Sequence, residues 1–333
     1  MSHERWHVIE KIQVQVAAVA ALALVYAVAW RLVWPRDVSG TFALIATGRF
    51  GALAATAVLV WVLAAACAVL TVSARAEGAV LATLLGVMGL SMRSAPIRLL
   101  VIAYGDSPGR LMVALAVEIA CLAVILLGAL AIIGAVRAVL LPICPTWLRP
   151  GRADQEDDSQ GEPSIAQRRL AEESVLKRMA NMALGIKPSS VAQRPSPGDR
   201  LTAIVGAFGI TLLVGWLLLI VTLREAQGVE RGQILAALAS SFLLSALLAD
   251  QLMPARLSLP HLAAPLVLAV GVYLHARGLQ PAGPLTWLHV PDLATALPID
   301  WLCAGCGGAV GGYWISSRIR EARHATAAAE TAA

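Results

Sequence analysis

Residues 91–120 include Arg93, Arg98 and Glu118, and long apolar sequence surrounds them on both sides. A lone carboxylate surrounded by lipid costs several kcal/mol, so Glu118 needs a partner or a proton. The turn-forming sequence Tyr-Gly-Asp-Ser-Pro-Gly at 104–109 predicts a hairpin. Antiparallel arms bring Glu118 to the depth of the two arginines, and we expect an ion pair with one of them.

Two interpretations of this intramembrane polar site stay open. In the functional one, Glu118 and an arginine line a site for a small solute or a proton. In the structural one, the ion pair serves only folding, or Arg93 and Arg98 extend to the membrane surface from a helix that does not fully cross. Replacing Glu118 by Gln and by Ala would separate these interpretations.

The composition requires that most of the chain lies in lipid. Of the 333 residues, 58% are hydrophobic and 14% are charged, against about 25% charged in soluble domains. The net charge of +5 comes without basic stretches interleaved with aromatic residues, which argues against nucleic-acid binding. Five cysteines, mostly within apolar sequence, do not form a disulfide framework. Arginine far exceeds lysine and alanine is abundant, which suggests a bacterial source.

Apolar segments long enough for membrane-spanning helices recur along the chain. We predict an all-α polytopic transmembrane bundle of about eight spans, with four spans within 1–136 and four within 201–317. The third segment is interrupted by Arg93 and Arg98, so it is the least suited to a full crossing. The segments are 13–34, 50–72, 79–103, 111–136, 201–223, 233–252, 259–278 and 298–317. The two groups of four predict parallel rather than inverted repeats, although no matching residues between them are evident.

A polar insert, 137–200, separates the two groups of helices. Its flanks are rich in Pro, Ser and charged residues, while 165–186 has the helix-start and helix-stop signals of an amphipathic helix. This helix is predicted to bind lipid, a protein partner or the bundle itself. Its apolar face consists of Val175, Leu176, Met179, Met182 and Ile186.

Basic residues orient the chain. Most of the 26 Lys and Arg residues fall on the side that holds 137–200 and the tail 318–333, which the positive-inside rule assigns to the cytoplasm. We therefore expect a bacterial inner-membrane protein with a cytoplasmic insert and C-terminus. If 79–103 does not span, the N-terminus lies on the opposite side.

The sequence Cys-Ala-Gly-Cys-Gly-Gly-Ala-Val-Gly-Gly at 303–312 contains two overlapping Gly-x-x-x-Gly pairs, a spacing typical of close helix packing. The packing residues are Gly307, Gly308, Gly311 and Gly312. Cys303 and Cys306 have the spacing of redox or metal sites. No further Cys pair or His cluster completes such a site, so we predict no metal site and leave the cofactor unknown.

Enzyme signatures are absent from the sequence: it has no His-Glu-x-x-His, no Gly-x-Ser-x-Gly and no phosphate-binding loop. The Pro-rich segment 280–300, which includes Asp300, is predicted to be an interfacial loop. Together these observations favour a non-catalytic scaffold or membrane subunit of a larger assembly, with the lipid bilayer and a protein bound through 165–186 as partners. The alternative is a permease or channel-like transporter with a polar site at Glu118.

Overall fold

The computed structural model describes residues 3–34, 39–104, 108–143, 197–223, 230–253, 258–279 and 292–332, and most of these residues are helical. The chain is rich in Ala, Leu and Val, which favours helices in lipid because only a helix satisfies all of its own backbone hydrogen bonds there. The amphipathic segment 165–186, with its five apolar residues, lies outside the described residues.

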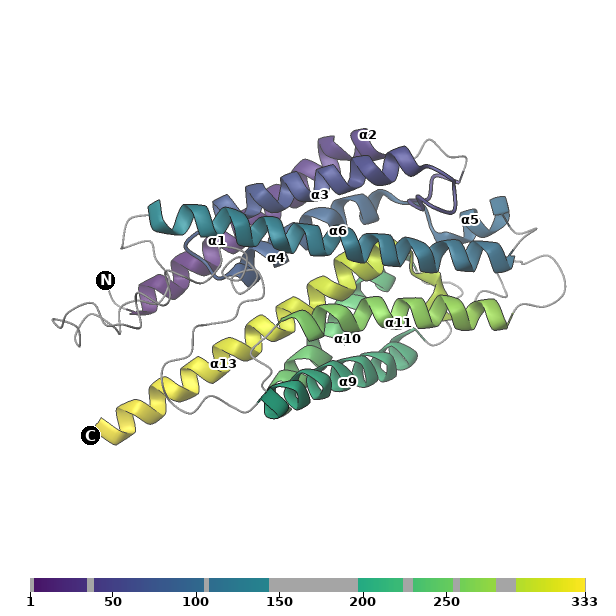
Figure 1. Ribbon diagram of the computed structural model, residues 1–333. Helices are drawn as coiled ribbons and strands as arrows, with labels where there is room; N and C mark the ends of the chain where they lie inside the picture. Colours follow the sequence, from purple (N-terminus) through teal and green to yellow (C-terminus); the bar gives the residue numbers. More distant parts are fainter. Residues whose placement is uncertain are drawn as a thin grey trace.

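The first half of the bundle comprises the helices before the insert (Figure 1). They are α1 (His3–Leu24), the π-helix η1 (Val25–Ala29), α2 (Trp30–Val33), α3 (Phe50–Leu70), α4 (Ala76–Arg93), α5 (Ile97–Tyr104) and α6 (Pro108–Ile143). The second half comprises α9 (Pro197–Thr222), α10 (Arg231–Leu252), α11 (Leu259–Gly278), the 3-10 helix η5 (Asp292–Thr295), α12 (Pro298–Asp300), the π-helix η6 (Trp301–Gly305) and α13 (Cys306–Ala332).

Seven of these helices are long and apolar enough to cross a membrane, which indicates a multi-pass membrane protein. Helix α1 begins and α13 ends at the same end of the bundle (Figure 1), which we call the terminal end. The opposite end holds the turn-forming segment 39–49, the helix α5 and the start of α10, and we call it the loop end.

The third apolar segment differs from the expectation of a continuous helix over 79–103. Helix α4 begins earlier, at Ala76, and ends at Arg93, after which Ser94 has an extended backbone and a separate short helix, α5, follows. Pro96 explains the break, because proline lacks an N–H and disfavours helical geometry in the residue before it. The hydrophobic span is therefore Ala76–Arg93, followed by an irregular segment at the loop end.

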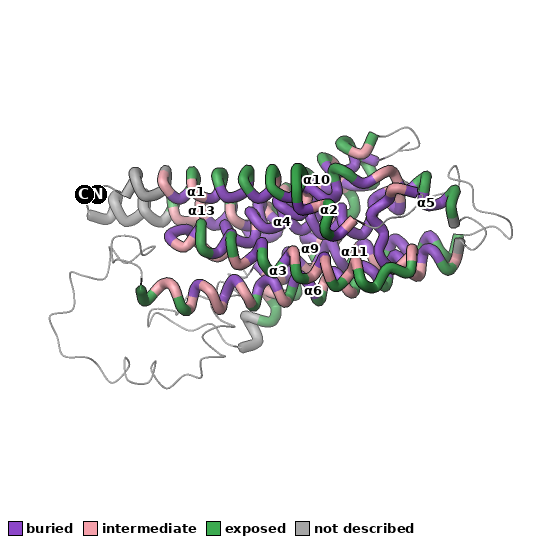
Figure 2. Tube along the Cα trace, turned by 90° about the horizontal axis from the view of Figure 1, so that it is seen from above, coloured by how far each residue is buried: buried purple, intermediate pink, exposed green. Residues whose placement is uncertain are grey.

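The eighth apolar segment becomes the core of the bundle. Residues 298–332 are helical throughout, through α12, η6 and α13, and residues 298–313 are all buried. Neighbours on several sides, α10, α4 and α11, shield this helix from lipid. That shielding explains why it is not among the seven apolar helices. In Figure 2 the exposed residues instead follow the outer faces of helices such as α1.

The two halves have the same order and direction of helices. Helices α3 and α6 pack together in the first half, as α10 and α13 do in the second, and α1 packs on α4 as α9 packs on α11. Between halves, α6 packs on α11 and α13 packs on α4. These two contacts are equivalent, because α6 corresponds to α13 and α4 corresponds to α11. This is the pattern of a two-fold pseudo-symmetry about an axis along the bundle. One difference is that α9 packs mainly on α10, whereas α1 packs mainly on α4.

Aligning equivalent helices reveals a sequence match that was not evident from the sequence alone. The pattern Arg-x-x-x-Leu-Ala-Ala-x-Ala begins α3 at Arg49 and α10 at Arg231. The pattern Leu-x-x-Ala-Leu-x-x-(Glu or Asp)-x-x-Cys occurs at 111–121 and at 293–303. Both patterns recur after the same interval of 182 residues, without a gap. The acidic residues of the second pattern are Glu118 and Asp300.

Candidate functional site

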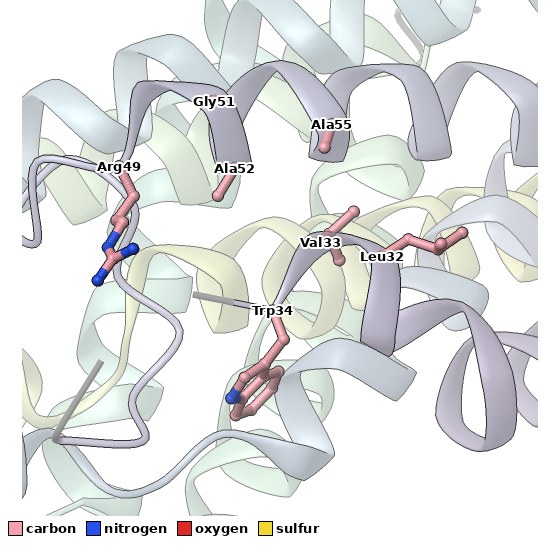
Figure 3. A pocket seen from close by; sticks show the side chains of 7 residues that line it. All are labelled: Leu32, Val33, Trp34, Arg49, Gly51, Ala52 and Ala55. Atoms are coloured by element: carbon pink, nitrogen blue, oxygen red, sulfur yellow. The ribbon is translucent and has the colours of Figure 1, made fainter. Parts of the chain in front are cut away.

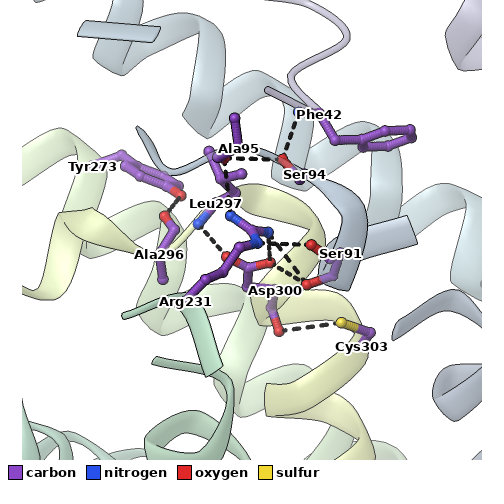
Figure 4. Close-up of polar contacts among 10 residues, drawn as sticks. All are labelled: Phe42, Ser91, Ser94, Ala95, Arg231, Tyr273, Ala296, Leu297, Asp300 and Cys303. Carbon is purple, nitrogen blue, oxygen red and sulfur yellow. Dashed lines mark hydrogen bonds and ion pairs between the residues drawn. The ribbon is translucent and has the colours of Figure 1, made fainter. Parts of the chain in front are cut away.

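Asp300 at the end of α12 and Arg231 at the start of α10 form an ion pair at the loop end (Figure 4). The Arg231 Nη2 and Asp300 Oδ1 atoms are 2.5 Å apart, and the two side chains are 12% and 1% exposed. Arg231 lies in the first turn of α10, which Glu230 and Gln233 cap reciprocally. Asp300, expected in an interfacial loop, instead ends the buried helix α12.

The same ion pair connects the two halves. From the first half, the Ser91 hydroxyl donates to Asp300 Oδ1 at 2.6 Å, and Arg231 donates to the carbonyl oxygens of Ser91 and Ala95 at 2.7 and 3.2 Å. The Leu297 amide donates to Asp300 Oδ2 at 2.8 Å. Each Asp300 oxygen is thus satisfied, as a buried charge requires, and Figure 4 shows the residues converging from both halves.

Glu118 occupies the equivalent position on α6, yet its environment differs. Its side chain is fully buried, and its Oε2 accepts hydrogen bonds from the backbone amides of Leu44 and Ile45 at 2.8 and 2.9 Å. Its Oε1 is buried without a hydrogen-bond partner. The two amides belong to segment 39–49, which folds into the bundle rather than over it.

Segment 39–49 can present these amides because its backbone turns sharply. Gly40 and Gly48 have φ of 61° and 69°, values that residues with a Cβ rarely adopt. The Thr47 hydroxyl donates to the Ala43 carbonyl, and the Phe42 amide donates to the Ser94 hydroxyl at 2.8 Å. The segment is therefore held both by its own turn and by the break after α4.

The expected ion pair between Glu118 and Arg93 or Arg98 does not form. Arg93 is exposed, its Nε donates to the Tyr26 carbonyl at 2.6 Å, and its guanidinium lies 4.4 Å from the Tyr26 ring centre and 4.5 Å from that of Trp30. Arg98 is exposed on α5. Depth along a two-helix hairpin was the basis of the prediction, and it ignored segment 39–49, which fills the space beside Glu118.

The 182-residue register pairs further residues of this polar layer. Arg49, at the start of α3, corresponds to Arg231, and Ser91 on α4 corresponds to Tyr273 on α11. Tyr273 is fully buried, donates to the Ala296 carbonyl at 2.5 Å, and interacts electrostatically with both Asp300 and Glu118. We call Ser91, Glu118, Arg231, Tyr273 and Asp300 the polar layer.

Arg49 lies away from this layer, beside an open groove. The groove has a volume of about 330 Å³ and runs between α2 and the start of α3. Figure 3 shows Arg49 at one end of it, with Trp34 and Ala52 on facing walls. The other residues that line the groove are apolar.

The four glycines of α13 divide into two pairs. A Cβ on Gly308 or Gly312 would overlap the backbone carbonyl of Ala239 or Leu243 on α10, whereas Gly307 and Gly311 have room for one. Close packing of α10 against α13 thus depends on Gly308 and Gly312. Cys303 and Cys306 are free and buried, with thiols directed at the Asp300 and Leu262 carbonyl oxygens. Within the described residues no group of three or more His, Cys, Asp or Glu could hold a metal ion.

A second set of charges lies at the terminal end. Arg318 and Arg320 on α13 pair with Glu10 on α1 and Asp250 on α10, and Glu321 pairs with Arg75 between α3 and α4. Burial lowers the pKa of Arg75, and the positive charge of Arg318 acts in the same direction. These pairs attach α13 to three neighbouring elements where it leaves the core.

In comparisons with known proteins, no family model, curated protein or solved structure matches this chain. Sequence reasoning identified Glu118 but missed Asp300, Arg231, Ser91 and Tyr273. The signal that points to them is the pair of repeated patterns, which places an acid at the same position in each half.

Proposed function

We propose that the protein is a permease for a small polar solute, which passes between its two halves. The observation that carries this proposal is the pair of equivalent acids, Glu118 and Asp300, buried at the loop end where the halves meet. Transporters built from repeats commonly bind solutes and coupling ions at the interface between repeats. Glu118 and Asp300 occupy equivalent positions in the two halves, but only Asp300 pairs with an arginine. Such a pair of acids suits a binding site between the halves.

Irregular helices near the polar layer support the proposal. Helix α4 breaks after Arg93, beside Ser91, and the π-helix η6 directly follows Asp300. Interrupted helices line the sites of many transporters, and π-turns within helices occur frequently at functional sites. Both irregularities lie next to the hydrogen bond between Ser91 and Asp300, which connects the two halves.

The proposed topology follows the charge distribution. The chain spans a bacterial inner membrane eight times, with the buried helix α12–α13 as the eighth span. The terminal end, the insert 137–200 and the tail face the cytoplasm, as the positive-inside rule favours. A reporter fused within the insert and active only in the periplasm would reverse this orientation.

Cysteine accessibility tests the permease without knowledge of the solute. Ala269→Cys on α11 and Leu84→Cys on α4 place a buried thiol on each of the two helices that contact the opposite half, in a background without native cysteines; both positions are 0–1% exposed. In a permease that opens alternately, a membrane-impermeant thiol reagent should modify both thiols in right-side-out and in inside-out vesicles. Leu213→Cys, at an exposed position in the middle of α9, is the lipid-facing control and should stay unmodified. Protection of both interface thiols from either side would reject the permease.

A scaffold remains the second candidate, and the charges of the terminal end favour it. Ion pairs fix α13 where it leaves the core, and it continues as a helix to Ala332. Replacing Val175, Leu176, Met179, Met182 and Ile186 by Ser should then abolish co-purification of a specific partner. Replacing the polar-face residues Arg169 and Glu173 by Ser is the matched control. Unchanged co-purification in both variants would count against the scaffold.

A further inference from the structure

Glu118 differs from the other buried acids of the described residues in the charge beside it. Asp300, Asp250 and Glu10 each pair with an arginine, whereas the hydrogen bonds to Glu118 come from two neutral backbone amides. Its Oε1, which is shielded from solvent, has no hydrogen-bond partner. The repeat makes the contrast sharper, because Asp300 at the equivalent position has its arginine and Glu118 does not.

An ionised Glu118 would fit this environment poorly. A carboxylate has about four acceptor sites, and two amides satisfy only one oxygen, so the second oxygen would lose its hydration without compensation. A neutral carboxylic acid fits the same geometry better, because an unpaired hydroxyl group costs far less to bury than an unpaired charge. Its carbonyl oxygen, Oε2, accepts both amides, and Oε1 carries the proton.

Neighbouring groups favour the neutral form as well. Of the described titratable groups, Tyr273 on α11 interacts electrostatically with Glu118, and it also interacts with Asp300 on α12. The charge of Arg231 is already taken by Asp300. The side chain of Arg49, the equivalent arginine of the first half, is exposed and lines the groove between α2 and α3.

We infer that Glu118 is a proton-binding site, in which the proton replaces the arginine that Asp300 uses in the second half. Binding forms one O–H bond on Oε1, with water as the source of the proton and its acceptor on release. Loss of the proton would place a negative charge against the Leu44 and Ile45 amides and would bind segment 39–49 more tightly. The site would thereby link proton binding to the loop end, and it gives the proposed permease its coupling ion. This coupling role of Glu118 rests on the proposed permease function.

Infrared spectroscopy of the purified protein tests the site directly. A protonated carboxyl group has a C=O stretching band that ionised carboxylates lack, and the band shifts in heavy water. The difference spectrum of the unmodified protein minus Glu118→Gln at neutral pH should show this band, and the band should disappear on alkalinisation. The glutamine side chain of that variant retains an oxygen that can accept the two amides, so the fold should persist, which size-exclusion chromatography checks.

Asp300→Asn is the matched control from the other half. Because Asp300 is paired with Arg231, its replacement should remove no protonated-carboxyl band. Absence of the band from the Glu118→Gln difference spectrum at neutral pH would overturn the inference. The infrared measurement needs no solute, so its outcome is independent of the cysteine-accessibility test of the permease. If the infrared band is missing but the interface thiols are accessible from both sides, only the proton site is rejected. A clear band with protected thiols would reject the permease alone.

Discussion

Arg231 and Asp300 stand 69 residues apart in the sequence and pair at the loop end, across two helical segments that run in the same direction. At the terminal end of the same two segments, Asp250 and Arg320 pair with the charges reversed, 70 residues apart. Gly308 and Gly312 pack on Ala239 and Leu243 between these two ion pairs. The two ion pairs thus fix the register of α10 against α13, which form the most extensive helix contact of the described fold.

Breaking the first of these pairs should strongly destabilise the protein. Arg231→Gln leaves Asp300 charged and buried, which costs about 3–5 kcal/mol. Arg98→Gln, at an exposed position on α5, should change stability by less than about 0.5 kcal/mol. The free energy of unfolding in detergent, measured by denaturant titration, checks both. The double variant Arg231→Gln/Asp300→Asn should cost less than the sum of the two single changes, because neither charge is then left alone.

The glycines of α13 provide a matched pair of substitutions. Gly308→Ala and Gly312→Ala insert a methyl group against the α10 backbone and should lower stability by about 1–3 kcal/mol. Gly307→Ala and Gly311→Ala have room and should be neutral or stabilising by up to about 1 kcal/mol, because alanine favours helix. Thermal unfolding in detergent compares the four variants. Equal effects of all four would contradict the packing of α10 on α13.

A disulfide can report the contact between halves. A Cβ on Gly307 would lie 3.8 Å from the Leu84 Cβ, close to the mean for disulfides. Leu84→Cys/Gly307→Cys, in a background without native cysteines and with a protease site in the insert, should keep the cleaved fragments joined under oxidising conditions. Leu84→Cys/Gly311→Cys is the control, since Gly311 faces Leu243 instead. Separation of the fragments in the first variant on a non-reducing gel would refute the α4–α13 contact.

Arg137 should stabilise the turn between α3 and α4. It is 5% exposed, and its guanidinium donates to the Thr71 and Ala74 carbonyl oxygens at 3.0 and 2.6 Å. Arg137→Gln should leave at least one carbonyl unsatisfied, at a cost of about 1–3 kcal/mol. Hydrogen exchange of the amides of residues 71–78 should speed up, while exchange within α9, which packs on α10 and α11, stays unchanged. Uniform acceleration over the bundle would instead indicate global destabilisation.

Apolar patterning predicted the helical class because lipid leaves the backbone few alternatives. It placed seven spans close to those of the structure, and it marked the third as the least suited to a full crossing because of Arg93 and Arg98. The pattern could not show that α4 begins at Ala76 or that α5 is separate, because those boundaries depend on one proline and on local turns. The expectation for the insert 165–186 concerns residues that the structure does not describe, and it stays a prediction.

At the candidate site, the sequence did not predict which residues contact one another across long sequence separations. Glu118 was identified as an isolated charge, but its hydrogen-bond partners are the backbone amides of Leu44 and Ile45. Every residue except proline has such an amide, so the sequence does not show which amide will serve as a partner. Asp300 was assigned to a loop because prolines surround it, although Pro298 only begins the helix α12. The repeated patterns were present in the sequence, but each involves few residues and becomes convincing only once equivalent helices are aligned.

The shielding of α13 has a consequence for biosynthesis. A translocon releases a segment into lipid when the segment is hydrophobic enough, and α13 with its serines, glycines and arginines is a poor substrate for that step. Of the described helices it also emerges last from the ribosome. Insertion of α13 into the bilayer should therefore require that α4, α10 and α11 are already inserted and can pack against it. Deleting one of these helices should leave α13 outside the bilayer.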